Sequence, residues 1–213
     1  MLIETFIVGM YETNCYIVYD EKTLEACIID PGDEAKRLAK FIDSKNLILN
    51  SIILTHYHYD HIGAVEELQR KYGSQIYCHK KEVEGLNDSQ INGSIIGKKK
   101  VIEVTGDKLL SDGNVIRVGE IDLEVIHTPG HTPGGICLRV KNKNIIFTGD
   151  TIFSDDLGRT DLIGGSEEVL KKTITNKVSK WPDNIIIYPG HGDICSMREV
   201  RGRKIQYLTS KVK

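Results

Sequence analysis

Apolar runs and helix-spaced apolar positions alternate along the first half of the chain. The runs are rich in β-branched residues and are bounded by turn residues such as Pro31-Gly32, a pattern typical of strands. They cover residues 2–8, 15–19, 25–30, 51–54 and 75–79. Apolar residues at helical spacing predict an amphipathic helix over residues 33–44, and a second helix is expected to begin near Ile62.

The second half of the chain repeats this order of strands followed by helix. Its alternating or apolar runs predict strands at residues 101–104, 114–118, 121–126, 136–140, 144–147 and 184–188. Ser166 is placed to cap a helix that reaches about residue 179, and residues 197–213 are expected to form a closing helix. The two halves, roughly residues 1–100 and 101–213, predict an α/β protein in which two sheets pack face to face with helices outside.

Composition narrows the class of protein. At 213 residues the chain is long enough for one large domain, and we expect a single domain over residues 1–213. The net charge of −2 provides no basic field for nucleic acid, and no apolar run approaches transmembrane length. Residues 1–4 lack the charged start of a signal peptide, and the five cysteines are scattered. We therefore expect a cytoplasmic protein with reduced thiols and no nucleic-acid or membrane partner; its oligomeric state is left open.

Residues 55–61 concentrate the chemistry of the chain. The stretch Thr55-His56-Tyr57-His58-Tyr59-Asp60-His61 follows one predicted strand and precedes a predicted helix. On an extended backbone His56 and His58 share a face, whereas Asp60 and His61 lie past a turn and aim at a second point. Imidazole and carboxylate are both metal ligands, so this spacing suits two metals better than one. The alternative, a loop that is rich in histidine by accident, is the weaker interpretation.

Further donors follow other predicted strands. Asp150 and His191 come directly after apolar runs, and either His127 or His131 is available from a loop with two prolines and three glycines. We favour His131, because His127 still belongs to the strand. His79 is expected to be structural, and Asp30 is expected to bond backbone amides in a turn instead of a metal. The candidate metal ligands, all at or past strand ends, are His56, His58, Asp60, His61, His131, Asp150 and His191.

Four segments together resemble the metal motifs of the metallo-β-lactamase superfamily, in order and across nearly the whole chain. They are residues 55–61, His127-Thr128-Pro129-Gly130-His131-Thr132-Pro133-Gly134, Phe147-Thr148-Gly149-Asp150-Thr151 and Tyr188-Pro189-Gly190-His191-Gly192. Residues 14–18 and 28–32 resemble the N-terminal strands of that superfamily. Residues 158–162, Gly-Arg-Thr-Asp-Leu, are similar to the short glyoxalase II-like (hydroxyacylglutathione hydrolase-like) hydrolases. True glyoxalase II enzymes carry a longer helical domain that binds glutathione, whereas about 22 residues follow His191 here.

The resemblance implies a four-layer αββα sandwich of two mixed β-sheets and a binuclear centre. By motif position, one metal is held by His56, His58 and His131, the other by Asp60, His61 and His191, with Asp150 bridging them. The implied cofactors are two divalent ions, with zinc expected and iron or manganese as alternatives. The implied reaction is hydrolysis of a small-molecule thioester, S-D-lactoylglutathione or another, by a hydroxide that bridges the metals.

Several roles stay open at this level. Asp60 is placed to orient the nucleophile, which makes it a candidate catalytic residue as well as a ligand. Arg159 and Tyr188 are candidate substrate contacts, although pairing with Asp161 and packing in the core are the favoured roles. Residues 80–100 predict helical turns and a loop whose lysines, Lys98 to Lys100, are either solvated or attract an anionic substrate. Alternative functions are a persulfide dioxygenase with one iron on His56, His131 and Asp150, and a nuclease or other hydrolase of the superfamily.

Overall fold

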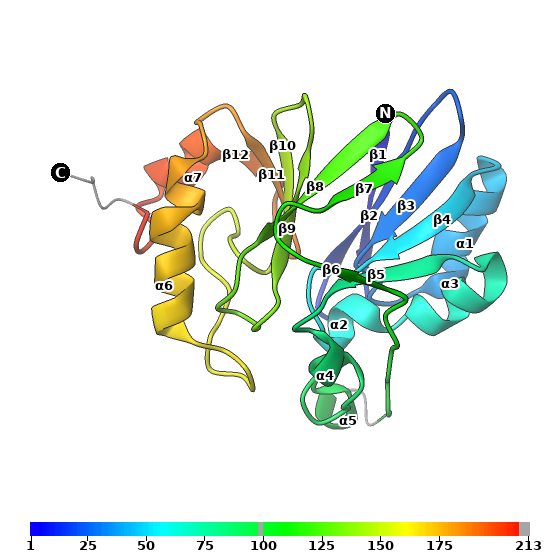
Figure 1. Cartoon of the computed structure of the whole chain (residues 1–213), viewed down its shortest axis with the longest axis horizontal. Coiled ribbons are helices and arrows are strands. Elements are labelled where there is room, and N and C mark those ends of the chain that lie inside the picture. Colours follow the sequence, from blue (N-terminus) through cyan, green and yellow to red (C-terminus); the bar gives the residue numbers. More distant parts are fainter. Residues whose placement is uncertain (98–99, 209–213) are drawn as a thin grey trace.

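The computed structural model describes residues 1–97 and 100–208, and in this range it forms two six-stranded sheets packed face to face. Helices lie on the outer side of each sheet, α1 and α3 on one side and α6 and α7 on the other (Figure 1). The expected αββα sandwich of two mixed sheets is therefore confirmed. The longest helices in the described part of the chain have 10 residues, about half of what a membrane span requires.

The first sheet follows the chain in order and changes from antiparallel to parallel pairing. Its strands are β1 (Leu2–Val8), β2 (Thr13–Tyr19), β3 (Glu25–Ile29), β4 (Ile48–Ile53), β5 (Gln75–His79) and β6 (Lys108–Leu110). The β1–β2 and β2–β3 pairs are antiparallel, whereas β3 to β6 run parallel. The parallel strands therefore bring their carboxyl ends to one edge, where α2 (Tyr59–Ile62), α4 (Val83–Leu86) and α5 (Ser94–Gly97) lie (Figure 1).

The second sheet is mainly antiparallel. Its strands are β7 (Val115–Val118), β8 (Ile121–His127), β9 (Ile136–Val140), β10 (Ile145–Gly149), β11 (Ile186–Pro189) and β12 (Cys195–Ser196). Only β10 and β11 among these pair in parallel. The helix α6 (Glu167–Asn176), the 3-10 turn η1 (Val178–Lys180) and α7 (Met197–Gly202) cover its outer face. The Ser166 hydroxyl accepts a hydrogen bond from the Val169 amide, which confirms the predicted N-cap of α6.

Three apolar layers stabilise the sandwich. The central layer joins the facing sides of the two sheets, with Ile29 and Ile53 from the first and Leu138 and Phe147 from the second. The outer layers bury the inward faces of α1 (Ala35–Ser44) and α3 (Val65–Tyr72) on one side and of α6 on the other. Strands such as β2 are buried on both faces, which explains their continuous apolar runs. All five cysteines are buried and free.

Two predicted elements are wrong. Residues 101–104 form no strand, although Ile102 and Val104 are buried as a strand pattern requires. The Val104 amide donates to the Leu86 carbonyl and the Ile102 carbonyl accepts from Asn92, so loop and side-chain partners replace a neighbouring strand. The chain then adds β6 to the first sheet, and it crosses to the second sheet only after Leu110.

The closing helix is shorter than predicted. It ends at Gly202, because the following turns place Lys204 and Tyr207 at φ values of 56° and 65°, which a right-handed helix cannot accommodate. The described part of residues 80–100 contains the expected helical turns, α4 and α5. Lys98 and Lys99 lie outside the described residues, and Lys100 is exposed.

Candidate metal centre

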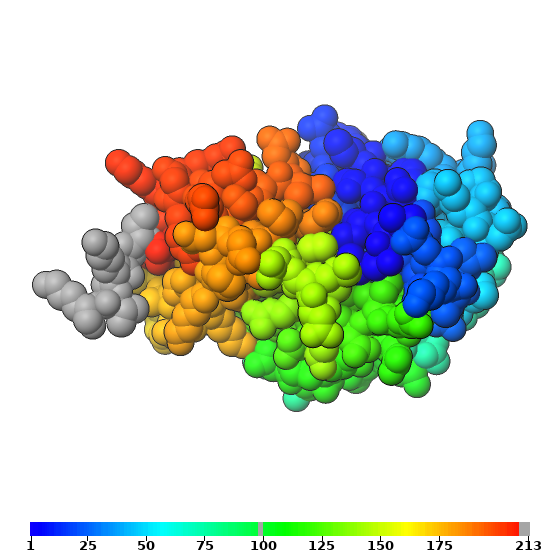
Figure 2. Space-filling model, turned by 90° about the horizontal axis from the view of Figure 1, so that it is seen from above, coloured from blue at the N-terminus to red at the C-terminus, as the bar shows by residue number. Residues whose placement is uncertain are grey.

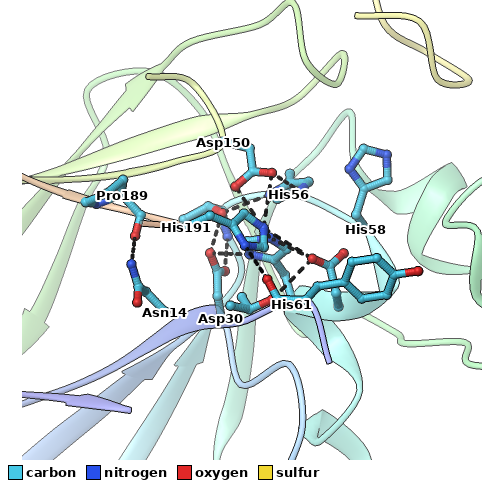
Figure 3. Close-up of polar contacts among 12 residues, drawn as sticks. Asn14, Asp30, His56, His58, His61, Asp150, Pro189 and His191 are labelled. Atoms are coloured by element: carbon cyan, nitrogen blue, oxygen red, sulfur yellow. Dashed lines mark hydrogen bonds and ion pairs between the residues drawn. The ribbon is translucent and has the colours of Figure 1, made fainter. Parts of the chain in front are cut away.

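All seven candidate ligands lie at the same end of the sandwich. Each follows the carboxyl end of a strand: β4 for the four residues of the 55–61 stretch, β8 for His131, β10 for Asp150 and β11 for His191. The side chains of Asp150, His56, His61 and His191 point toward one another (Figure 3). Their nitrogen and oxygen atoms form two trios, in each of which the ligand atoms lie within 4.8 Å of one another.

The first trio consists of His56, His58 and His131, and all three rings are buried. The Nδ1 atom of His58 lies 2.9 Å from Nε2 of His131. The other nitrogen of His131 donates to the Arg159 carbonyl at 2.7 Å, and Nδ1 of His56 lies 3.1 Å from the Thr55 hydroxyl. These bonds place a proton on the outer nitrogens of His131 and His56, so that their Nε2 atoms are free to bind a cation.

The second trio consists of Asp60, His61 and His191. The Nε2 atoms of the two histidines are 3.2 Å apart, and Asp60 Oδ2 lies 3.5 Å from the first and 3.3 Å from the second. Their outer nitrogens also have acceptors, since Nδ1 of His61 lies 3.0 Å from Asp30 and Nδ1 of His191 lies 3.0 Å from the Tyr11 carbonyl. The Thr13 hydroxyl donates to Asp60 at 3.2 Å. In both trios, then, acceptors bond the outer nitrogens of histidines and leave inner nitrogens for a cation, and the second trio has one carboxylate in place of an imidazole.

Asp150 lies between the trios. Its Oδ2 is 3.5 Å from His131 Nε2 and 3.7 Å from His191 Nε2, while its Oδ1 is 3.4 Å from His61 Nε2. Within residues 1–97 and 100–208, Asp150 Oδ1 and His56 Nε2 are buried atoms without a hydrogen-bond partner. Buried polar atoms without a hydrogen-bond partner are costly, and a bound cation would satisfy both of these atoms. The donor set therefore fits a divalent ion at each trio, and Asp150 lies where it could reach either.

Protonation differs between the two trios. Burial and the neighbouring histidines lower the pKa of His58 to about 3 and the pKa of His56 well below its usual value. Burial alone would also lower the pKa of His61, but the carboxylates of Asp150, Asp60 and Asp30 raise it to about 10. His56 and His58 are therefore neutral donors, whereas metal binding at the second trio must displace a proton from His61.

Asp30 orients both trios from behind. One carboxylate oxygen accepts the Thr55 amide at 2.7 Å, and the other accepts the Thr55 hydroxyl at 2.5 Å and lies 3.0 Å from His61 Nδ1. The expectation that Asp30 bonds backbone amides in its turn is met only in part, because its amide partner is Thr55, 25 residues away, and the contact with His61 is an addition. Although Asp30 oxygens also lie near His56 and His61, these donors already satisfy them, so Asp30 positions ligands.

Sequence reasoning missed two other supporting residues. The Asn14 amide donates to the carbonyls of Pro189 at 3.0 Å and Gly192 at 2.8 Å, which fixes the loop that carries His191 (Figure 3). Glu82 is fully buried behind the first trio. Asn14 stood inside a motif without a distinct signal, and Glu82 lies in the charged run Lys80-Lys81-Glu82, which is typical of a solvated surface.

The remaining candidates lie outside the trios. Arg159 makes two hydrogen bonds to Asp161, at 2.7 and 2.8 Å, and only its backbone carbonyl reaches the centre, through His131. Tyr188 packs between the sheets, with its ring centroid 5.5 Å from that of Tyr16. His127 stacks on His79, with ring centroids 4.2 Å apart. The preference for His131 over His127 therefore agrees with the geometry, as do the structural interpretations of His79 and Tyr188.

Comparison with known proteins points to one family. The family described as "Metallo-beta-lactamase superfamily" matches residues 8–191. The chain is 38% identical to "Probable metallo-hydrolase YqgX" of Bacillus subtilis, over 87% of each chain. It is 33% identical to "Hydroxyacylglutathione hydrolase GloC" of Haemophilus influenzae, over 99% of this chain and 100% of that protein. The crystal structure of "BLEG-1 B3 metallo-beta-lactamase" superposes with a TM-score of 0.90 at 33% identity, over 98% of this chain and 100% of the other. The chain therefore belongs to the metallo-beta-lactamase superfamily.

Proposed function

We propose that the chain is a binuclear metal-dependent hydrolase that cleaves thioesters in the manner of a hydroxyacylglutathione hydrolase. The observation that carries this proposal is the position of Asp150, whose two oxygens face both trios. The relative from Haemophilus influenzae, which carries that activity in its name and is matched over its full length, supports the choice of a thioester. Zinc is the proposed metal, because five of the seven donors are imidazoles.

Two divalent ions, when bound, supply an acidified water as nucleophile and a Lewis acid for the substrate carbonyl. The chain fixes where this chemistry takes place. His56, His58 and His131 would hold the first position, with His56 and His58 as neutral donors, and Asp150 would be available to both positions. Asp60, whose side chain is 19% exposed, borders solvent and is held by Thr13, so it can accept a hydrogen bond from the attacking water and orient it.

The expected leaving group explains what the centre lacks. The pKa of a thiol is low enough for the thiolate to leave without protonation by a strong general acid. Among the described residues, Asp30 is the ionisable side chain outside the ligand set that hydrogen-bonds a trio, and it acts there as an acceptor of hydrogen bonds. The five buried free thiols favour a reducing compartment, and we propose the cytoplasm.

Metal analysis combined with a substrate panel tests the proposal. Protein purified without added metal should contain two ions per chain, and it should hydrolyse thioesters such as S-D-lactoylglutathione. Removal of metal with a chelator should abolish turnover, and added zinc should restore it. A protein that holds both ions yet cleaves no thioester would refute the proposed reaction. Cleavage of a β-lactam by the same protein would indicate a β-lactamase instead.

A mononuclear-iron persulfide dioxygenase is the second candidate. His131 and His56 lie 3.5 and 3.9 Å from Asp150, which provides two histidines and one carboxylate, the ligand set of many non-haem iron oxygenases. The complete second trio counts against it, because one iron leaves Asp60 and His191 unused. Oxygen uptake with glutathione persulfide, together with one iron per chain, would favour this candidate.

A further inference from the structure

Glu82 is a carboxylate that the proposed reaction does not use. It precedes α4 in a run of charged residues, and its neighbours Lys80, Lys81 and Glu84 are exposed. Glu82 itself has an exposed fraction of 0%. Glutamate is rarely buried to this degree without a partner, so its environment requires an explanation.

The partners of Glu82 are two backbone amides. Its Oε2 accepts the Tyr57 amide at 2.8 Å, and its Oε1 accepts the Gly134 amide at 2.5 Å. Tyr57 lies between His56 and His58 in the sequence, and Gly134 is three residues after His131. One side chain thus joins the two loops that supply the whole first trio, although those loops come from different sheets.

The chemistry of this junction is specific for a carboxylate. Each of the two carboxyl oxygens accepts one of the two amides, whereas a glutamine would turn its NH₂ group toward one of them. The loop is shaped around the same atom, because a Cβ on Gly134 would lie 2.7 Å from Glu82 Oε1. A second direct link between the loops, from the Ile136 amide to the Thr55 carbonyl at 3.0 Å, lies on the strand side of the trio.

We propose that Glu82 is a positioning residue of the metal centre, which fixes the first trio by holding the Tyr57 and Gly134 amides at a set separation. The inference rests on the proposed function only in requiring that the centre binds metal. His58 and His131 have a ring–ring nitrogen distance of 2.9 Å, and a shift of either loop changes it directly. Loss of the Glu82 link should therefore weaken the first metal position while leaving the ligands themselves intact.

The test compares Glu82→Gln with a matched control, Asp20→Asn. Asp20 also accepts two backbone amides, from Lys22 and Glu120, but it lies at the other end of the sandwich. Zinc affinity is measured by chelator competition, and cobalt-substituted protein is examined by visible absorption, which reports ligand geometry. Glu82→Gln should lower zinc affinity by about 10- to 100-fold and alter the cobalt spectrum, as expected for an outer partner of metal ligands. Asp20→Asn should change neither.

The outcomes separate this inference from the proposed function. If Glu82→Gln folds and keeps wild-type affinity and spectrum, Glu82 is only structural and the inference is overturned. If Glu82→Gln does not fold, Glu82→Asp, which keeps the charge but has a shorter reach, is judged by the same two readouts. Wild-type protein that binds two ions without thioester turnover would refute the proposed reaction and leave the Glu82 result valid. Wild-type protein that binds no metal would overturn both.

Discussion

The two ends of the sandwich are joined by the same kind of contact and serve different purposes. At the end away from α2, Asp20 and Glu25 of the first sheet accept the amides of Glu120 and Gly119 from the second, both at 2.7 Å. Figure 2 shows this end, where the blue N-terminal strands lie beside the yellow-green β9–β10 turn. At the metal end, Glu82 joins the sheets in the same way.

The pKa values show how the two ends differ. At the far end the backbone amides of Lys22 and Glu120 lower the pKa of Asp20. At the metal end burial raises the pKa of Glu82 to about 8, although the amides of Gly134 and Tyr57 oppose the rise. At the far end, where Asp20 is also buried, the amide hydrogen bonds outweigh desolvation of the carboxylate, whereas at the metal end the desolvation of Glu82 outweighs its hydrogen bonds. The metal end therefore keeps its sheet-joining carboxyl group where burial acts on it most strongly, next to the loops that supply the first trio.

The largest effect should come from removing a ligand. His58→Ala takes one of three nitrogens from the first trio, and we expect kcat/KM for thioester hydrolysis to fall by well over about 100-fold, more than the loss of an outer partner costs. The fold should persist, because His58 lies at the metal end and outside the apolar clusters formed by the described residues. Circular dichroism and thermal unfolding of the metal-free variant check this, and retained thioesterase activity would contradict the binuclear mechanism.

A smaller effect should follow from loosening the ligands. Asp30→Asn keeps the shape of the side chain but removes an acceptor from Thr55 or His61. We expect metal affinity to fall by about 10- to 100-fold, with activity recovered at high metal concentration. Zinc titration of the metal-free variant measures the effect. Affinity equal to that of the wild type would mean that His61 is oriented by its other neighbours alone.

The metal ligands and Glu82 show what the sequence could and could not predict. The ligands were predictable, because His56, His58, Asp60 and His61 stand together and the others each follow an apolar strand. Their positions at or just past predicted strand ends also predicted that they meet at one edge of the sheets. Glu82 was not predictable, because a glutamate among lysines has the pattern of a surface, and its burial depends on two loops that lie 25 and 52 residues away in the sequence. The prediction of a strand at residues 101–104 was wrong for a related reason. Buried and exposed residues do alternate there, but the backbone bonds to loops and not to a neighbouring strand.

The stability of the metal-free protein should depend on pH through the second trio. The pKa of His61, usually about 6.5, is raised to about 10 in the folded protein by Asp150, Asp60 and Asp30, in spite of burial. A raised pKa stabilises the fold fully below about pH 6.5, and this contribution is lost as pH rises toward 10. The Tm of metal-free protein should therefore fall between these values. Zinc-loaded protein is the control, because a cation replaces the proton, and it should show a smaller fall.

A modest effect is expected from Arg159→Ala. The guanidinium pairs with Asp161, and both side chains are exposed, at 62% and 68%. Exposed pairs contribute little, and the loop carbonyl that holds His131 belongs to the backbone. We expect kcat/KM to change by less than about threefold. A selective rise in KM for substrates with a carboxylate, absent in Asp161→Ala, would show instead that Arg159 contacts the substrate.

The smallest effect on activity should come from a substitution at the far end. This substitution tests most directly whether the two ends of the sandwich differ. Asp20→Asn replaces an acceptor of the Lys22 and Glu120 amides, so the Tm should fall slightly. Because Asp20 and its described amide partners lie at the opposite end of the sandwich from the ligand loops, metal content and kcat/KM at 25 °C should equal those of the wild type. A loss of metal affinity in this variant would mean that the two ends are coupled through the sheets. The geometry of the metal ligands would then depend on contacts throughout the sandwich, and Glu82 would not be the residue that fixes it.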